Sequence, residues 1–259
     1  MDLERWRKFV RSLDCSPLFV TVSGADIYGF PSPDSDVDLR GCHMLLLEKV
    51  VGLKMPDETI DHSTIDEGTE VDLVSHEVGK YFRLLVKNNG YVLEQIFSPL
   101  VVTGQEFLDV LRPIATRCVT RHHYHHYHHY RGFYATTRKL LEKQDVKKAK
   151  SLLYAYRVLM TGIHLMKSGL IETDVRVMYS DLGLDFIPDL IAAKREEKIE
   201  LPNLDWKFHL QQLERLEQKL TESFEASSLP DGRDSTSVNE LLVELRLQPE
   251  RFGFSSNLS

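Results

Sequence analysis

The chain of 259 residues is poor in cysteine and has no long apolar segment. Its three cysteines, Cys15, Cys42 and Cys118, are widely spaced without a CxxC pair, which excludes a disulfide framework and a zinc knuckle. We expect buried thiols. No apolar run approaches the roughly 20 residues of a membrane-spanning helix, and residues 1–14 lack the apolar core of a signal peptide. We therefore expect a cytoplasmic protein that has no membrane partner.

An excess of positive charge is also lacking, since the formal net charge is −7. This argues against a protein that coats nucleic acid nonspecifically, because such binding depends on neutralising many phosphates. A local basic patch can still bind one RNA end or a triphosphate. The length and the 42% of hydrophobic residues accommodate a catalytic domain with a helical extension.

Hydrophobic patterning predicts a mixed first part and an all-helical second part. Three short segments alternate like strands, and the polar stretch from Asp57 to Thr69 predicts a hairpin or a mobile loop before the third of them. The expected strands are residues 18–22, 36–41 and 70–74. The expected helices are residues 2–14, 76–87, 90–97, 106–111, 114–141, 147–168, 204–224 and 238–247. The fold class is therefore α+β, a small mixed sheet with flanking helices followed by an all-α region.

The most informative segment is SGADIYGFPSPDSDVDLRG, from Ser23 to Gly41. Strand alternation puts Asp36 and Asp38 on one face, and Asp72 on a later strand can join them. Like charges at such close range repel, so a divalent cation is the simplest compensation, and oxygen ligands favour Mg²⁺ or Mn²⁺. A bare Asp-x-Asp is typical of a solvated strand face. The longer pattern, with an apolar strand and a glycine before it, is more specific to metal-dependent chemistry.

This segment resembles the nucleotidyltransferase signature of the DNA polymerase beta superfamily, in which a Gly-Ser turn precedes an Asp-x-Asp strand. It is most similar to the nucleotidyltransferase family associated with bacterial and phage RNA-repair operons, whose members read approximately Gly-Ser-x-x-Tyr-Gly and Ser-Asp-x-Asp-Leu-Arg-Gly. The resemblance covers roughly residues 18–160. It implies a polymerase-beta-like core, two Mg²⁺ (or Mn²⁺) ions, and transfer of NMP from an NTP with release of pyrophosphate.

The resemblance assigns the metal and catalytic roles to Asp36, Asp38 and Asp72. Glu70 and Asp66 remain alternatives for the third carboxylate, because the preceding loop varies in length within the family.

The upstream turn is expected to bind the nucleotide. Gly24 allows backbone amides to approach the triphosphate. Ala25 stands where the family has a serine that contacts the phosphates, so one hydrogen bond worth about 1 to 3 kcal/mol is missing. Ser23 or Ser35 can take over part of that role.

A run of histidines and tyrosines, residues 121–133, is the most unusual composition in the chain. Three interpretations stay open: an aromatic packing stripe, a metal site built from histidines four residues apart, and a nucleic-acid or nucleotide surface. The third interpretation makes Tyr127 and Arg131 substrate-binding residues.

The following helix presents a basic and aromatic face, because Lys147, Lys150, Tyr154 and Arg157 recur every three or four residues. Its alternative is a solvated charged face. In similar enzymes a helix after the catalytic domain binds the triphosphate and the base, which would make Lys150, Tyr154 and Arg157 nucleotide-binding residues. For Arg40 and Glu94 we expect a salt-bridge role and a core role.

The expected domains are a nucleotidyltransferase domain, residues 1–105, and a helical domain, residues 106–259, with a flexible linker near 226–237 and a disordered tail after Pro249. The expected function is NMP transfer from NTP to a hydroxyl acceptor, with an RNA end, of tRNA or in RNA repair, as the favoured partner. NMPylation of a protein or small molecule, and an inactive nucleotide-binding module, are the alternatives. The sequence leaves the oligomeric state open.

Overall fold

The structure is a computed structural model that describes residues 1–13, 17–33, 35–54, 56–121, 126–145, 148–196 and 205–254; the side chains of 126–128 are outside this set. Contacts divide the chain into two compact units. The sheet unit comprises residues 1–24, 36–118 and 233–259, and the helical unit comprises residues 25–35 and 119–232. None of the described helices is long and apolar enough to cross a membrane.

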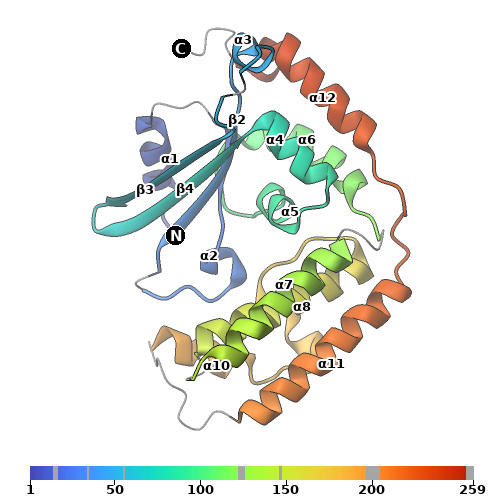
Figure 1. Ribbon diagram of the computed structural model, residues 1–259. Helices are drawn as coiled ribbons and strands as arrows, with labels where there is room; N and C mark the ends of the chain where they lie inside the picture. Colours follow the sequence, from blue (N-terminus) through green and yellow to red (C-terminus); the bar gives the residue numbers. More distant parts are fainter. Residues whose placement is uncertain are drawn as a thin grey trace. The chain divides into compact units, whose positions relative to one another are not determined.

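The sheet unit is built on five strands in the order β3-β4-β2-β1-β5. Figure 1 shows β3, β4 and β2 side by side. The central neighbours β2 and β4 are parallel, whereas β1 pairs antiparallel with β2 and β5, and β3 antiparallel with β4. The strands are β1 (Pro17–Val22), β2 (Val37–His43), β3 (Thr59–Asp66), β4 (Thr69–Glu77) and β5 (Val101–Thr103). The expected small mixed sheet is confirmed.

Helix α1 (Leu3–Ser12) covers one face of this sheet. Asp2 caps the helix by accepting hydrogen bonds from the backbone N–H groups of Glu4 and Arg5. The buried side chains of Trp6 and Val10 pack in one core cluster with strand residues that alternate along β1, β2 and β4. Those strand residues are Val20, Val22, Val37, Leu39, Val71 and Leu73. Residues between them in the alternation, including Asp38 and Asp72, therefore lie on the opposite face.

Part of that opposite face packs against helices further along the chain. Phe19 of β1 lies edge-on to Tyr81 and stacked on Phe107, with ring centroids 5.4 and 6.2 Å apart. These rings belong to α4 (Val78–Val86) and α6 (Gln105–Cys118). The unit also contains α3 (Leu47–Val50), α5 (Gly90–Ile96), α12 (Ser235–Leu247) and the 3-10 helix η2 (Pro249–Phe252).

The last helix, α12, returns to the sheet unit and lies beside α4 and α6 (Figure 1). Arg246 forms an ion pair with the buried Glu77 and donates a 3.0 Å hydrogen bond to the carbonyl of Leu45. Phe252 and Phe254 pack edge-on against Phe107. The expectation of disorder directly after Pro249 is therefore wrong as far as Phe254, because these aromatic rings are held by the core; residues 255–259 lie outside the described set.

The helical unit is centred on α8 (Ala149–Ser168), in which 14 of 20 residues are buried. Its neighbours are α7 (His126–Lys143) and α11 (Trp206–Glu225) (Figure 1). Both approach α8 closely at Gly162, where a Cβ would lie 3.0 Å from atoms of Tyr130 and Leu220. The remaining elements are α2 (Ala25–Tyr28), α9 (Val175–Met178), η1 (Ser180–Leu182) and α10 (Ile187–Arg195).

Several boundaries differ from the sequence expectations for local reasons. The stretch after Asp57 forms the hairpin β3–β4, whose turn residues Glu67 and Gly68 both have positive φ, as two-residue hairpins require. The expected helix break before Ile114 is absent, since α6 runs through Pro113 from Gln105 to Cys118. The expected continuous helix 114–141 is wrong, since α6 ends at Cys118 and α7 begins at His126.

The predicted domain boundary at residue 105 also differs from the two units. Helix α6 packs against β1 and α5, and α12 packs against α4 and α6, so both belong with the sheet. The chain enters the helical unit after Cys118, where Arg117 pairs with Asp234 at 2.7 Å. Cys42 and Cys118 are free and buried, as expected; Cys15 lies outside the described residues.

Candidate active site

Two aspartates lie side by side on the parallel strands β2 and β4. Asp38 and Asp72 are direct register partners, and their side chains are 32% and 36% exposed. Asp36 precedes β2 by one residue and is exposed. Of the three candidates for the carboxylate on the later segment, Asp72 alone occupies the register position opposite Asp38, whereas Glu70 and Asp66 pair with residues of the β3–β4 hairpin.

A glycine turn lies against the Asp38 carboxylate. Gly24 has φ +68°, and a Cβ at this position would lie 2.1 Å from Asp38 Oδ2, so any other residue would collide with the carboxylate. The preceding residue, Ser23, donates its backbone N–H to the Asp38 carbonyl at 2.8 Å. The turn that the sequence assigns to nucleotide binding therefore lies directly against Asp38.

Arg40 links the two carboxylates. Its Nη2 lies 2.7 Å from Asp38 Oδ1 and 3.3 Å from Asp72 Oδ2. Asp72 also accepts a 2.8 Å hydrogen bond from the hydroxyl of Ser63 on β3. The salt-bridge role expected for Arg40 is confirmed, and Ser63 is a contact that no sequence pattern indicated.

The environment of Asp38 opposes its ionisation. Burial raises the pKa of Asp38 above its usual value, the guanidinium of Arg40 lowers it, and the negative charges of Asp72 and Asp36 raise it further, with a net upward direction. The three predicted carboxylates therefore interact electrostatically. A cation bound at this position would favour the ionised form of all three.

The donor set fits a divalent metal by its chemistry. Asp38 and Asp72 supply hard carboxylate oxygens on adjacent strands, and the guanidinium of Arg40 already stands between them as a cation. Among the described residues, no group of three or more His, Cys, Asp or Glu side chains is close enough to hold a metal. Mg²⁺ commonly binds through one or two carboxylates together with substrate phosphates and water, so the Asp38–Asp72 pair satisfies that requirement.

The other predicted nucleotide-binding residues lie in the helical unit and differ in exposure. Lys150 is exposed on α8. Tyr154 is partly buried and packs edge-on against Tyr28 and Phe30, with ring centroids 5.8 and 5.5 Å away. Arg157 is only 1% exposed, and its guanidinium carbon lies 4.0 Å from the centroid of the Tyr28 ring. The predicted basic face is therefore divided between an exposed lysine and a buried arginine; Lys147 lies outside the described residues.

Within the helical unit, the segment from Ala25 to Ser35 is held by polar contacts with residues later in the chain. The buried Lys194 of α10 donates from Nζ to the Phe30 carbonyl at 2.8 Å and to the Ser32 hydroxyl at 2.6 Å. Thr173 donates its hydroxyl to the Ile27 carbonyl at 3.1 Å. Neither Lys194 nor Thr173 belongs to a periodic or recognisable pattern, so the sequence does not indicate these contacts.

Three further residues are expected from the sequence to bind the nucleotide or the substrate: Ser35, Arg131 and Tyr127. The Ser35 hydroxyl accepts the backbone N–H of Ser32 at 2.9 Å and closes a local turn. Arg131 is half exposed, with Nε 3.8 Å from a carboxylate oxygen of Glu217. The side chain of Tyr127 lies outside the described residues. Tyr130, within the histidine and tyrosine run, and Tyr134, directly after it, are buried, which agrees with a packing stripe in this part of α7.

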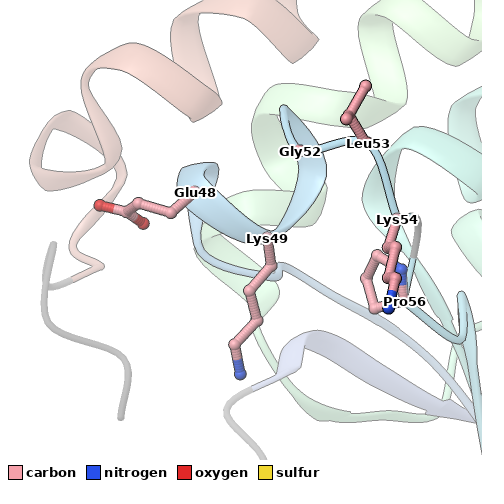
Figure 2. A pocket seen from close by; sticks show the side chains of 6 residues that line it. All are labelled: Glu48, Lys49, Gly52, Leu53, Lys54 and Pro56. Atoms are coloured by element: carbon pink, nitrogen blue, oxygen red, sulfur yellow. The ribbon is translucent and has the colours of Figure 1, made fainter.

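A surface depression in the sheet unit is lined by none of these carboxylates. Figure 2 shows the side chains that line it, from α3 and the following turn. These are Glu48, Lys49, Gly52, Leu53, Lys54 and Pro56. Among the described lining residues only Glu48 carries a carboxylate, so the depression lacks the paired acids that phosphate-transfer chemistry requires.

The mixed sheet, with paired carboxylates behind a glycine turn, is a nucleotidyltransferase fold of the DNA polymerase beta type. A family model described as the RNA repair pathway DNA polymerase beta family (RlaP) matches residues 2–244. The chain belongs to this family.

Individual relatives are similar over parts of the chain. The chain is 35% identical over 164 residues to the uncharacterized protein MJ0002 of Methanocaldococcus jannaschii. This alignment covers 61% of this chain and 63% of that protein. It is 25% identical over 195 residues to the uncharacterized protein YcgL of Bacillus subtilis. This second alignment covers 73% of this chain and 71% of that protein. A crystal structure of a nucleotidyltransferase-like protein from Exiguobacterium sibiricum aligns with 95% of this chain and 86% of its own, at 14% identity and a TM-score of 0.32.

Proposed function

We propose that this protein is a metal-dependent nucleotidyltransferase that transfers NMP from an NTP to a hydroxyl acceptor, and that the acceptor is an RNA end. The observation that supports the reaction is the register pair of Asp38 and Asp72, with Gly24 against the Asp38 carboxylate. The description of the family as part of an RNA repair pathway supports the acceptor.

In the proposed reaction, the acceptor oxygen forms a bond to the α-phosphorus, and the bond from that phosphorus to pyrophosphate breaks. Asp38 and Asp72 would hold Mg²⁺ or Mn²⁺ together with substrate phosphates, and Asp36, directly before β2, remains the proposed third carboxylate of a site for two ions. The ions would supply charge neutralisation for the triphosphate and activation of the attacking hydroxyl. The chain's own residues orient the reactants. Gly24 allows the backbone of the turn to lie directly against the Asp38 carboxylate, because a side chain at this position would collide with Asp38 Oδ2.

Other residues of the sheet unit organise the carboxylates. Ser63 orients Asp72 through a 2.8 Å hydrogen bond. The backbone hydrogen bond from Ser23 to Asp38 ties the turn to β2. These contacts preorganise the acidic pair before substrate binds, and preorganised charge is a major source of rate enhancement. In the helical unit, exposed Lys150 remains our proposal for the residue that binds the triphosphate, and partly buried Tyr154 for the base.

The test is to incubate the purified protein with Mg²⁺ or Mn²⁺, each labelled NTP in turn, and a mixture of tRNA and other RNA. RNA and protein are then resolved on denaturing gels. We expect label in RNA, and none with the double variant Asp36→Ala, Asp38→Ala. Label in the protein band would instead indicate NMPylation, and NTP binding without any transfer would indicate an inactive nucleotide-binding module.

A further inference from the structure

Arg40 is placed so that it neutralises the candidate metal ligands from within the same sheet. Its Nη2 contacts Asp38 Oδ1 at 2.7 Å and Asp72 Oδ2 at 3.3 Å. Its Nη1 donates to the carbonyl oxygens of Leu39 and Asp72, both at 2.8 Å. One guanidinium thus contacts both carboxylates and is fixed by two backbone acceptors.

This guanidinium lies between the two carboxylates that would hold a metal in the proposed function. One nitrogen of Arg40 contacts one oxygen of Asp38 and one oxygen of Asp72, so these two oxygens are already engaged by a cation. Nearby Asp36 adds a third negative charge that interacts with Asp38. With all three acids ionised and one guanidinium, the cluster keeps an excess of negative charge, which attracts a divalent cation although Arg40 is present.

Another arginine of the sheet unit provides a comparison. Arg5 of α1 pairs with Asp66 at 2.8 Å, and its side chain is 25% exposed, close to the 23% of Arg40. Arg5 also donates to the hydroxyl of Thr69, so it connects α1 to the β3–β4 hairpin. Arg5 therefore has a structural role, whereas Arg40 connects the two carboxylates that the proposed function uses.

We propose that Arg40 is an internal cation that competes with the divalent metal for the Asp38–Asp72 pair and so sets the metal affinity of the site. This inference rests on the proposed function. In the metal-free protein the guanidinium neutralises the pair and holds the two strands' carboxylates together. Metal binding displaces Nη2 from at least one carboxylate. Arg40 is thus a positioning residue that keeps the pair ready and weakens metal binding until substrate phosphates add further ligands.

The experiment is a Mn²⁺ titration followed by the electron paramagnetic resonance signal of free Mn²⁺, without nucleotide, on full-length protein. We expect Arg40→Gln to bind Mn²⁺ about tenfold more tightly than the wild type, because the competing charge is removed. Arg40→Lys keeps a charge and should stay within a few-fold of the wild type. Arg5→Gln is the matched control and should leave the Mn²⁺ affinity unchanged.

The outcomes separate this inference from the proposed function. Equal or weaker Mn²⁺ binding by Arg40→Gln, with Asp38-dependent binding in the wild type and an unchanged circular dichroism spectrum, would overturn the competition and leave the metal site standing. If Asp38→Asn does not reduce Mn²⁺ binding, either in the wild type or in combination with Arg40→Gln, the metal assignment of the proposed function is wrong, and the proposed competition is wrong with it. Tighter Mn²⁺ binding by Arg40→Gln, but not by Arg40→Lys or Arg5→Gln, supports both the competition and the metal site.

Discussion

The sheet unit and the helical unit place their charged residues in different environments. In the sheet unit, Asp38, Asp72 and Arg40 lie on a partly exposed face, where they can reach a ligand. In the helical unit, Arg157 and Lys194 are buried, with exposed fractions of 1% and 8%, and contact the segment from Ala25 to Ser35. Similar charged side chains thus form a candidate reaction site in one unit and internal supports in the other.

The comparison shows why a charge pattern has a different meaning on a strand and on a helix. Side chains of a strand alternate between two faces, so an acid between buried neighbours must lie on the open face. A helix such as α8 is buried on most sides, and its spacing of three or four residues groups side chains without telling which group is exposed. Four predictions test this difference, and they run from the largest expected effect to the smallest.

The largest effect is expected from the acidic pair. Asp38→Asn should lower NMP transfer about a thousandfold, because metal-assisted charge stabilisation contributes several kcal/mol to the transition state. Label transfer at saturating NTP measures this. Glu70→Gln is the matched control, since Glu70 is an exposed acid two residues before Asp72 and should be dispensable. Equal loss in both variants would mean that general negative charge, and not the register pair, supports the reaction.

The second prediction contrasts the two basic residues of α8. Arg157→Met should lower the free energy of unfolding of the protein by about 2 kcal/mol, because a desolvated cation–π contact with Tyr28 is lost. Lys150→Met should leave stability unchanged and weaken NTP binding. Urea unfolding and NTP titration of both variants give the answer. Unchanged stability with lost NTP affinity in Arg157→Met would restore Arg157 to the nucleotide-binding role that its sequence position indicates.

The third prediction concerns the support of the segment from Ala25 to Ser35. Lys194→Met removes the hydrogen bonds to the Phe30 carbonyl and the Ser32 hydroxyl, and should cost about 1.5 kcal/mol of stability. Lys167→Met on α8 is the control, because Lys167 is exposed and should be neutral. Chemical unfolding measures both variants. A neutral Lys194→Met would show that packing alone holds this segment.

The smallest effect is a pH dependence that both units share. Burial lowers the pKa of His43 in the sheet unit and of His209 in the helical unit. Below the unfolded pKa of about 6.5, the unfolded chain binds protons that the folded state excludes, so stability falls as the pH falls towards the folded pKa values. Each group contributes up to about 1.4 kcal/mol per pH unit.

Urea unfolding at pH 7.5 and 5.5 measures this loss, and the variants His43→Gln and His209→Gln assign it to one unit or the other. In each variant, the free energy of unfolding should fall less between pH 7.5 and pH 5.5 than it does in the wild type. A wild type equally stable at both pH values would contradict the burial of neutral histidines.

The sequence predicts more of the sheet unit than of the helical unit. Alternation around Asp36 and Asp38 predicts β2, which begins at Val37, so that Asp38 lies within the strand and Asp36 directly before it. It does not predict that Asp72 lies opposite Asp38, because β2 and β4 are separated along the chain by β3 and pair only in the folded sheet. Strand β5 has three residues, which is too short for alternation to be recognised.

In the helical unit, long helices are predictable from their apolar spacing, but their contacts are not. Arg157 fits a basic face in the sequence, yet it is buried against Tyr28 because α7, α10 and α11 pack around α8. Lys194 carries no recognisable pattern at all. Its contact with Phe30 joins residues 164 positions apart, and only folding brings them together.

The measurement that tests the central claim most directly is the Mg²⁺ dependence of NTP affinity. Calorimetric titration with a non-hydrolysable NTP analogue would compare the wild type and Asp38→Asn, each with Mg²⁺ and with a chelator. We predict at least about tenfold tighter binding with Mg²⁺ in the wild type and no such difference in Asp38→Asn, because the carboxylate pair couples metal to triphosphate. An affinity of the wild type that is the same with Mg²⁺ and with the chelator would contradict the assignment of this site.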